Sequence, residues 1–554
     1  MASINLGKIA FSWKGPYNAA TTYAKQDVVE SGGSSFICLL DGTVGVVPVV
    51  GANWALFAQG TSSVTTAAGE LIYNNGTGLV ALPIGAAGEV LQVDTDTLLP
   101  VWGPADVRSS TRVKAFPASV TEKHSQVNTY RTFGVIMNDD SVRMWGDNAI
   151  YKLGDGTTND RSYPQRPGFP AGFPGAEKLY LTWNASMHCI DKNGELWGWG
   201  DNPQGQIGTG DVTDQSVPYN ASANALNSIN GKVVTHLAMP GGTQNSHTVI
   251  ALCDDGTVHS CGYNGYGQLG QGDTAQRTNF NLVPAVTDIV DVAATRETHT
   301  AVFAVKADGT LYSWGKNDEG QLGSGSTTQS NLAVARTTGS ISGKTIVKVF
   351  CGPGSSYALD SDNTLHSAGR NSDGQLGIGN TTVSLSYAQA TTDVAQVFAG
   401  GYDYPVVMII KTDGTLWACG ASDYGANGSE PIGDRTTFQQ IDLGQTVQKV
   451  VHGGSGSYNW AMALLADGTC RSWGYNSNGQ LLTGDTTNRL LSAVNTVPTG
   501  NATIVDIACW GGTSEGSVGL LASDGQLFVG GYAGSSSLPE DDDENSYVPM
   551  PVPF

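Results

Sequence analysis

The sequence predicts an all-β protein whose main part is a β-propeller of about eight four-stranded blades. Two observations carry this prediction. Glycine accounts for 73 of the 554 residues and charged residues for only 14%, a composition that suits short strands joined by tight turns better than amphipathic helices. A glycine-rich motif also recurs along most of the chain, each time after an apolar run and a tight turn. Together they indicate one sheet-forming unit repeated many times.

One glycine anchors each copy of the repeat. The stretch "SWGKNDEGQLGSG" begins at Ser313, and its relatives begin at Met144, Gly198, Ser260, Ser367, Ala418, Ser472 and Val529. The anchoring glycines are Gly146, Gly200, Gly262, Gly315, Gly369, Gly420, Gly474 and Gly531, and subtraction gives spacings of 54, 62, 53, 54, 51, 54 and 57 residues. A repeat of this length indicates a solenoid or a propeller.

The order of segments within each period favours the propeller. An apolar run such as "HTAVFAVKADG", the turn Asp308-Gly309 and then "LYSWG" predict a β-hairpin. An upstream run such as "VDVAA" supplies a further strand. Eight hairpins predict eight blades over residues 111–554. Seven blades are the alternative, because one terminal hairpin could complete another blade as a closing latch.

The Asp-Gly turn, the "WGxNxxGQLGxG" motif and this period together resemble the regulator-of-chromosome-condensation repeat. The resemblance implies a propeller and leaves the function open. Within the motif, the asparagines are expected to hold the turn by bonding to nearby backbone; they are Asn148, Asn202, Asn264, Asn317, Asn371 and Asn476. The tryptophans are expected to wedge between neighbouring blades, with smaller residues replacing them in some copies; they are Trp145, Trp199, Trp314 and Trp473.

Residues 1–60 are predicted to form a separate small β module. Their pattern of aromatic residues, Asp-Val-Val, a glycine turn and a closing tryptophan resembles the small chitinase-type carbohydrate-binding module. This resemblance makes four aromatic residues candidates for binding, namely Trp13, Tyr17, Tyr23 and Trp54. The module is also a candidate for attachment to a virion.

Residues 61–110 are predicted to be an oligomerisation segment or linker. Their order of "GELIY", "LPIGAAGEVLQV" and "PVWG" resembles a segment of bacteriophage tail fibres. The segment has too few large apolar residues for a monomeric core, so it is expected to intertwine with copies of itself. The resemblance implies a homotrimer.

Charge and cysteine content exclude several classes of partner and site. The net charge is −21 with no strongly basic stretch, which argues against binding to nucleic acid. No apolar run approaches the roughly 20 residues of a membrane span, so no membrane insertion is expected. The eight cysteines lack a C-x-x-C pair, which argues against a structural zinc site. We interpret them as buried thiols of a chain folded in a reducing cytoplasm, and we predict no metal and no cofactor.

The residue that follows each anchoring glycine varies from copy to copy, whereas scaffold positions keep one residue type. These variable positions and two nearby tyrosines could form a contact surface on one propeller face, because tyrosine offers large contact area with few rotatable bonds. The candidates are Tyr263, Tyr266, Lys316, Arg370, Tyr424, Tyr475 and Tyr532. Ordinary surface variation is the alternative interpretation.

From these resemblances we predict a non-enzymatic bacteriophage virion protein, a tail fibre, spike or receptor-binding appendage, located in the virion after synthesis in the host cytoplasm. Residues 1–110 would bind other virion proteins, and the propeller loops would bind a glycan or protein of the host surface. A capsid-decorating protein and a polysaccharide-degrading tailspike enzyme are the alternatives.

Overall fold

The computed structural model divides the chain into two compact units, Met1–Arg108 and Ser109–Phe554. In the first unit the structure describes residues 12–16, 18, 20–22, 27–31, 34–38, 54–58, 71–74, 79–82, 89–93 and 100–104. In the second unit it describes residues 112–116, 132–182, 186–239, 247–295, 300–400, 405–430, 432–454, 458–495, 503–510, 516–532 and 546–552. The domain limits at 60 and 110, and the resemblance of residues 1–60 to a carbohydrate-binding module, stay predictions.

The first unit contains one four-stranded sheet and two hairpins in its described residues. The sheet has the order β1 (Ser12–Pro16), β2 (Asp27–Ser31), β3 (Ser34–Cys38) and β4 (Trp54–Ala58). The hairpins pair β5 (Leu71–Asn74) with β6 (Leu79–Leu82) and β7 (Glu89–Val93) with β8 (Pro100–Pro104). Of the four candidate aromatics, Trp13 lies in β1 and Trp54 begins β4, but their side chains are outside the description. Tyr17 and Tyr23 lie outside the described residues.

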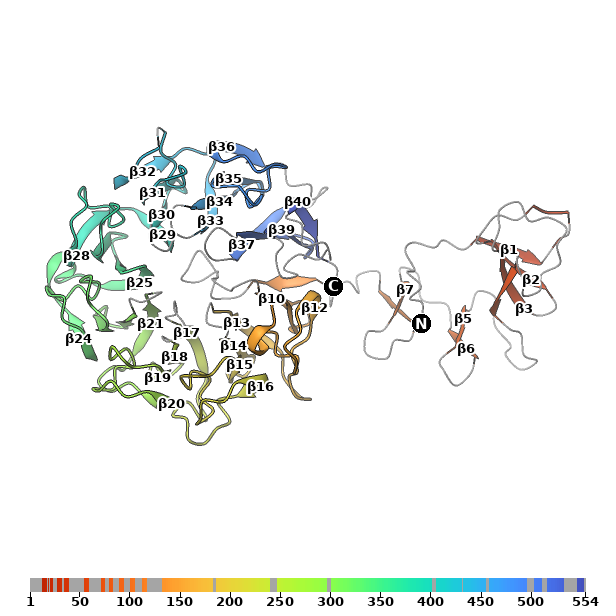
Figure 1. Ribbon diagram of the computed structural model, residues 1–554, viewed down its shortest axis with the longest axis horizontal. Coiled ribbons are helices and arrows are strands. Elements are labelled where there is room, and N and C mark those ends of the chain that lie inside the picture. The colour runs from red at the N-terminus through yellow and green to blue at the C-terminus, as the bar shows by residue number, and fades with distance from the viewer. Residues whose placement is uncertain are drawn as a thin grey trace. The chain divides into compact units, whose positions relative to one another are not determined.

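The second unit is a ring of blades, and its described residues form eight four-stranded antiparallel sheets (Figure 1). The first four blades are β9 (Val113–Ala115), β10 (Thr132–Met137), β11 (Val142–Gly146) and β12 (Arg161–Gln165); β13 (Ala176–Tyr180), β14 (Ser186–Asp191), β15 (Leu196–Gly200) and β16 (Gln215–Asn220); β17 (Val234–Ala238), β18 (Thr248–Cys253), β19 (Val258–Gly262) and β20 (Arg277–Leu282); and β21 (Ile289–Ala294), β22 (Ala301–Lys306), β23 (Leu311–Gly315) and β24 (Ser330–Arg336).

The last four blades repeat this order. They are β25 (Ile346–Gly352), β26 (Ser355–Asp360), β27 (Leu365–Gly369) and β28 (Ser384–Thr391); β29 (Val394–Gly400), β30 (Val406–Lys411), β31 (Leu416–Gly420) and β32 (Arg435–Ile441); β33 (Val447–Gly453), β34 (Trp460–Leu465), β35 (Cys470–Gly474) and β36 (Arg489–Asn495); and β37 (Ile504–Trp510), β38 (Ser517–Ala522), β39 (Leu527–Gly531) and β40 (Ser546–Pro551). Two 3-10 turns, η2 (Ala149–Tyr151) and η4 (Gly339–Ile341), lie in connections. The predicted all-β propeller is confirmed.

The ring closes without a shared strand, which fixes the number of blades at eight. Each blade, including the first and the last, is built from one continuous stretch of chain. The first blade meets the last through a hydrogen bond from the Val113 amide to the Gly525 carbonyl (2.9 Å) and an ion pair between Arg112 and Asp524 (3.3 Å). Val113 also shares one apolar cluster with Val529. The seven-bladed alternative with a closing latch is therefore wrong.

Strand position within a blade explains the burial pattern. The second strands pack against neighbouring blades on both faces, so their sequences are continuous apolar runs. In β18 and β34, for example, all six residues are buried. The outermost strands face solvent along one edge, and β24 contains no fully buried residue. This difference explains why the sequence shows the inner hairpins clearly and the outer strands weakly.

The predicted tryptophan wedges are confirmed for three blades. The indole Nε1–H of Trp199, Trp314 and Trp473 donates to the carbonyl oxygen of Lys152, Gln268 and Ala426, respectively, in the preceding blade, at 2.8–2.9 Å. Where cysteine replaces tryptophan, the thiol takes the same role: Cys261 and Cys419 lie 3.3 and 3.4 Å from carbonyl oxygens of the preceding blade.

The cysteines that the structure describes are all buried and free. Burial raises the pKa of the Cys253 and Cys470 thiols to about 12, so both are protonated at neutral pH. The predicted buried thiols are thus confirmed for these positions, while the side chain of Cys38 lies outside the description.

Candidate functional site

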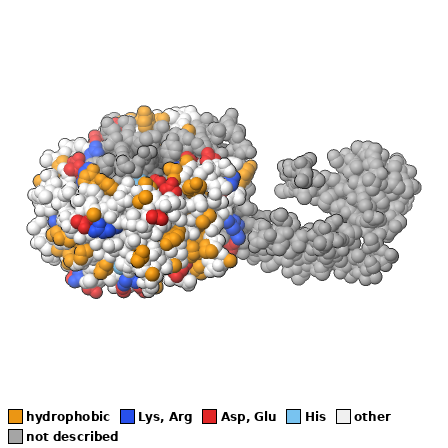
Figure 2. All heavy atoms as spheres, turned by 60° about the horizontal axis from the view of Figure 1, so that its bottom comes forward, with side chains coloured by type: hydrophobic (Ala, Val, Ile, Leu, Met, Phe, Trp, Pro, Cys, Tyr) orange, Lys and Arg blue, Asp and Glu red, His pale blue; other side chains and the backbone are white. Residues whose placement is uncertain are grey.

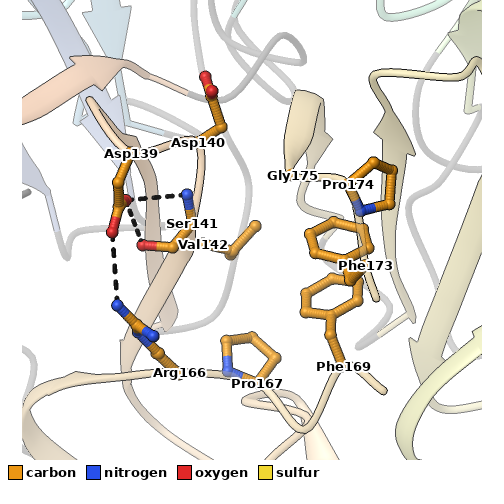
Figure 3. A pocket seen from close by; sticks show the side chains of 10 residues that line it. All are labelled: Asp139, Asp140, Ser141, Val142, Arg166, Pro167, Phe169, Phe173, Pro174 and Gly175. Carbon is orange, nitrogen blue, oxygen red and sulfur yellow. Dashed lines mark hydrogen bonds and ion pairs between the residues drawn. The ribbon is translucent and has the colours of Figure 1, made fainter. Parts of the chain in front are cut away.

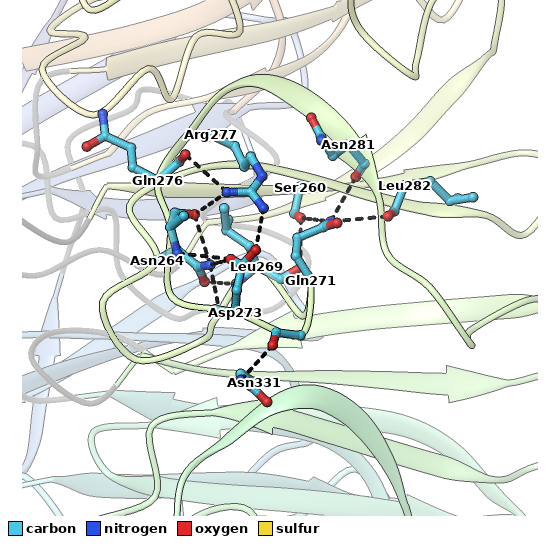
Figure 4. A network of polar contacts seen from close by, with 12 residues as sticks. Ser260, Asn264, Leu269, Gln271, Asp273, Gln276, Arg277, Asn281, Leu282 and Asn331 are labelled. Atoms are coloured by element: carbon cyan, nitrogen blue, oxygen red, sulfur yellow. Dashed lines mark hydrogen bonds and ion pairs between the residues drawn. The ribbon is translucent and has the colours of Figure 1, made fainter.

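In six of the eight blades one asparagine holds the loop that follows the third strand, as Figure 4 shows for Asn264. Its side-chain oxygen accepts from the amide of Leu269 (2.9 Å), and its Nδ2 donates to the carbonyls of Asp273 (3.1 Å) and Ala275 (3.0 Å). Arg277 pairs with the Asp273 carboxylate (2.6 Å). In five other blades the side-chain oxygen of the equivalent asparagine also accepts a hydrogen bond from the backbone amide five residues later. These asparagines are Asn148, Asn202, Asn317, Asn371 and Asn476. The predicted role of these asparagines is confirmed.

Antiparallel order places these loops on one face of the propeller. Neighbouring strands in a blade run in opposite directions, so the first and third strands run the same way. The loop after the third strand therefore lies at the same end of the sheet as the connection between the first and second strands. We call this end the loop face. The opposite end, which carries tight turns such as Asp308-Gly309, is called the turn face.

Three tyrosines from two blades meet on the loop face. Tyr424 follows β31, Tyr475 follows β35, and Tyr458 precedes β34. The ring centroids lie 5.1 Å apart for Tyr424–Tyr475, 4.9 Å for Tyr458–Tyr475 and 6.3 Å for Tyr424–Tyr458. Tyr458 is 40% exposed, and the other two are half-buried. We call this group the tyrosine triad.

The sequence predicted two members of the triad and missed Tyr458. Tyr458 lies in the connection between the first and second strands of its blade, and that connection carries no repeated motif. The available signal was topological: in an antiparallel blade this connection must lie beside the end of the third strand. An aromatic residue just before the second strand was therefore a candidate for the same face.

Three further predicted residues meet at the boundary between the third and fourth blades. Tyr263 and Tyr266 lie edge to face with centroids 6.2 Å apart. The ammonium of Lys316, from the next blade, lies 4.9 Å from the centroid of the Tyr266 ring. It also pairs with Asp318 at 2.9 Å. This second cluster is thus a cation–π pair with its own carboxylate.

The remaining predicted residues lie in other blades. Arg370 donates to the hydroxyl of Ser372 (3.1 Å) and lies 3.9 Å from the Asp373 carboxylate. Tyr532 is half-buried, and its carbonyl accepts from the hydroxyl of Ser517 (3.0 Å). The role of all seven candidates in binding stays a prediction.

An acidic group occupies the equivalent positions of the first two blades. Asp201 follows the anchoring glycine of the second blade, and its carboxylate lies 3.8 Å from Nδ1 of His247. Burial, followed by the neighbouring Asp214 carboxylate, raises the pKa of Asp201 to about 6, while Lys152 acts in the opposite direction. The folded protein therefore retains a proton on Asp201 at mildly acidic pH.

Because the pKa of Asp201 is raised, the difference in stability between the Asp201→Asn variant and wild type is expected to depend on pH. Between about pH 4 and 6 folded Asp201 keeps a proton that the unfolded chain has released, so wild-type stability falls as pH rises through this window. Asparagine stays neutral and can still donate to Asp214. We expect the melting temperature of D201N, relative to wild type, to be higher at pH 7 than at pH 4 in thermal denaturation. An equal difference at both pH values contradicts the assignment.

A pocket of about 300 Å³ opens on the turn face of the first blade (Figure 3). One wall is formed by Phe169 and Phe173, whose stacked rings have centroids 3.9 Å apart. The other wall carries Asp139, which accepts from the amide and hydroxyl of Ser141 and pairs with Arg166 at 3.3 Å. None of the predicted site residues lines it. Its polar groups bond one another, so the geometry indicates no specific ligand.

Charged side chains occur in small separate groups on the surface in view in Figure 2, interspersed with hydrophobic ones. Within the described residues, no group of three or more His, Cys, Asp or Glu side chains is arranged to hold a metal ion. Among the same residues, no helix is long and apolar enough to cross a membrane.

Comparison with known proteins identifies the repeat. Residues 255–302 and 308–359 match the family model described as the regulator of chromosome condensation (RCC1) repeat, and residues 346–375 match a second model of that description. The chain is 28% identical over 363 residues to the ultraviolet-B receptor UVR8 of Arabidopsis thaliana, which covers 64% of this chain and 77% of the receptor.

Two further similarities concern a ligase and a solved structure. The chain is 32% identical over 191 residues to the probable E3 ubiquitin-protein ligase HERC4 of Homo sapiens, covering 34% of this chain and only 17% of the ligase. The crystal structure of Prp20p from Saccharomyces cerevisiae, described with its binding to Gsp1p and histones, aligns with a TM-score of 0.49 at 18% identity, covering 73% of this chain and 94% of that one.

The prediction of a bacteriophage tail fibre, spike or receptor-binding appendage is wrong. UVR8 and HERC4 are eukaryotic proteins, and the likeness to UVR8 extends over most of the chain. The phage assignment rested on residues 61–110 together with the module-like residues 1–60. The small residues and glycine turns of such segments are common to many short hairpins and carry little family information. The alternatives of capsid decoration and polysaccharide degradation fall with it.

The partners that followed from this assignment are overturned for the same reason: other virion proteins, a glycan or protein of the host surface, and further copies of the chain in a trimer. The expected location in a virion depended on that function and is left as a prediction. The resemblance that the repeats showed is confirmed. The chain carries RCC1 repeats, and in the described residues the propeller has eight four-stranded blades.

Proposed function

We propose that the propeller is a non-catalytic platform that binds a partner protein through its loop face, in a regulatory or adaptor role. The observation that supports this proposal is the tyrosine triad, in which Tyr424, Tyr458 and Tyr475 gather partly exposed rings from two blades. Tyrosine is enriched at the centres of protein interfaces because it combines apolar area with a polar tip.

The fold does not require tyrosine at these positions. The residue equivalent to Tyr475 is Asp201, Lys316 or Arg370 in other blades. Each of those blades forms the same four-stranded sheet in the same strand order. Within the described residues the structure records no hydrogen-bond partner for the three hydroxyl groups of the triad, which leaves them available to a ligand. The supporting scaffold is rigid, because the adjoining loop is fixed through buried Asn476.

The relatives are consistent with a role in regulation. UVR8 is by its name a receptor, and the segment shared with HERC4 is a minor part of that ligase. A propeller segment within a larger protein suits a binding module better than a catalytic centre. The partner of this chain is not implied by either name.

Site-specific photocrosslinking tests the proposal. A benzoyl-phenylalanine probe replaces exposed Ser477, two residues after Tyr475, and in a matched protein it replaces Ser361 on the turn face. Illumination in an extract of the source organism is expected to give a covalent protein adduct from the Ser477 probe. Adduct formation should be lost when Tyr424 and Tyr475 are changed to serine. Equal adducts from the Ser361 probe, or adducts insensitive to the tyrosines, contradict a binding role for the loop face.

A further inference from the structure

Resting on the proposed function, we propose that the tyrosine triad recognises lysine or arginine side chains presented by a basic segment of the partner protein. Three features carry this inference: an equivalent tyrosine elsewhere in the propeller is already covered by a cation, the described residues supply no such cation to the triad, and acidic side chains gather in the blade that supplies Tyr424.

The cation–π pair of the second cluster shows how this loop face places a cation on a tyrosine. Tyr266 stands four residues after the anchoring glycine Gly262, and Lys316 stands one residue after the next anchoring glycine, Gly315. The Lys316 ammonium lies 4.9 Å from the ring centroid and 2.9 Å from Asp318. A tyrosine face and a carboxylate therefore hold one ammonium group between neighbouring blades.

The triad occupies the same two positions three blades further along, at the boundary between the sixth and seventh blades. Tyr424 stands four residues after Gly420, and Tyr475 stands one residue after Gly474. Thus Tyr424 corresponds to Tyr266, whereas the place of Lys316 is taken by Tyr475. In the described residues the chain supplies aromatic faces at this boundary but no lysine, which leaves the place of the cation to a side chain of another molecule.

Acidic side chains gather at the sixth blade, which supplies Tyr424 to the triad. Asp423 immediately precedes Tyr424 and is exposed. Asp434 accepts from the amide of Ser422 at 3.1 Å. The loop that carries Asp373 in the fifth blade packs against the start of β32, since a Cβ on Gly374 would lie 2.7 Å from the Cα of Thr436.

The negative charge here is only partly compensated. Burial, followed by the carboxylates of Asp373 and Asp423, raises the pKa of Asp434, so the three carboxylates are close enough to interact. Two cations lie nearby. Arg435 donates its guanidinium to the carbonyls of Asn427 (2.7 Å) and Gly428 (2.9 Å), and Arg370 lies 3.9 Å from Asp373. Neither forms a short ion pair with Asp423 or Asp434 in the described residues.

Charge complementarity therefore selects the occupant. Aromatic rings beside carboxylates attract a guanidinium or ammonium group more strongly than a neutral side chain, because ring quadrupole and carboxylate charge act in the same direction. The aliphatic stem of lysine or arginine also covers aromatic surface that would otherwise stay in contact with water.

Peptide binding measured by fluorescence anisotropy tests the inference. The probes are a labelled peptide of alternating glycine and arginine and its counterpart with citrulline, a neutral isostere, in place of arginine, at about 0.15 M ionic strength. The arginine peptide is expected to bind the full chain about tenfold more tightly than the citrulline peptide. Changing Tyr424 and Tyr475 to serine should remove most of this difference.

Two single variants separate local recognition from general attraction to an acidic protein. Asp423→Asn should weaken arginine-peptide binding about three- to tenfold. Asp362→Asn makes the same charge change on the turn face and should leave affinity unchanged. Equal affinity for both peptides, equal weakening by D362N, or no binding of the arginine peptide overturns the inference. Crosslinking from Ser477 would persist if only the preference for cations were wrong, so the two proposals fail separately.

Discussion

Replacing Trp314 by alanine is expected to lower the free energy of unfolding of the propeller by about 3–5 kcal/mol, the range for truncating a fully buried tryptophan. Trp314 is 0% exposed and packs among residues of the preceding blade, including Val283. Its indole donates to the Gln268 carbonyl at 2.9 Å. The substitution thus opens a cavity between two blades and leaves a buried carbonyl without its donor, which adds to the cost.

The shift of the urea denaturation midpoint measures this effect. Trp417→Ala is the matched control, because Trp417 is only half-buried and its indole bonds within its own blade, to Thr415 (2.8 Å). We expect this control to cost about 1 kcal/mol. Similar midpoint shifts for the two variants would show that Trp314 does not hold neighbouring blades together.

Replacing Gly315 by alanine is expected to cost about 2–5 kcal/mol, the sum of a left-handed backbone penalty and an overpacking penalty. Gly315 has a φ of +93°. A Cβ there would lie 2.6 Å from the Thr300 carbonyl oxygen and 3.4 Å from the Cα of Gln268 in the preceding blade. Both neighbours are backbone atoms, which cannot turn aside as a flexible side chain could.

Gly343→Ala separates the two contributions. Gly343 has a φ of +71°, but a Cβ there would meet no atom within 4 Å. We expect this control to cost only about 1–2 kcal/mol, from the backbone conformation alone. Thermal denaturation of both variants measures the difference, and an equal loss of stability would contradict the steric argument for the anchoring glycine.

The repeated scaffold was predictable because its constraints act over short distances in the sequence. The Asn317 side chain accepts from the amide five residues on and donates to carbonyls nine and eleven residues on, so one motif contains donor and acceptors together. Blade number was less certain, since ring closure depends on contacts such as Val113 with Gly525, at opposite ends of the propeller.

The candidate site was predictable only in part. Variation after the anchoring glycines singled out Tyr475, and Tyr424 was added as a nearby tyrosine, but their meeting depends on how the sixth blade packs against the seventh. Tyr458 lies in a connection that no motif marks. The predicted function failed because it relied on two short N-terminal resemblances, whereas the family models match the repeats.

Quantitative affinity enrichment from an extract of the source organism tests the binding role of the loop face most directly. The baits are the wild-type chain, the double variant Tyr424→Ser and Tyr475→Ser, and the control Tyr163→Ser, in which Tyr163 is a 46% exposed residue of the outer strand β12. All three baits should first show matching melting temperatures. We predict that at least one protein recovered with wild type and with Y163S falls about tenfold with the double variant. Recovery of the same proteins in the same amounts by all three baits would contradict the proposed function.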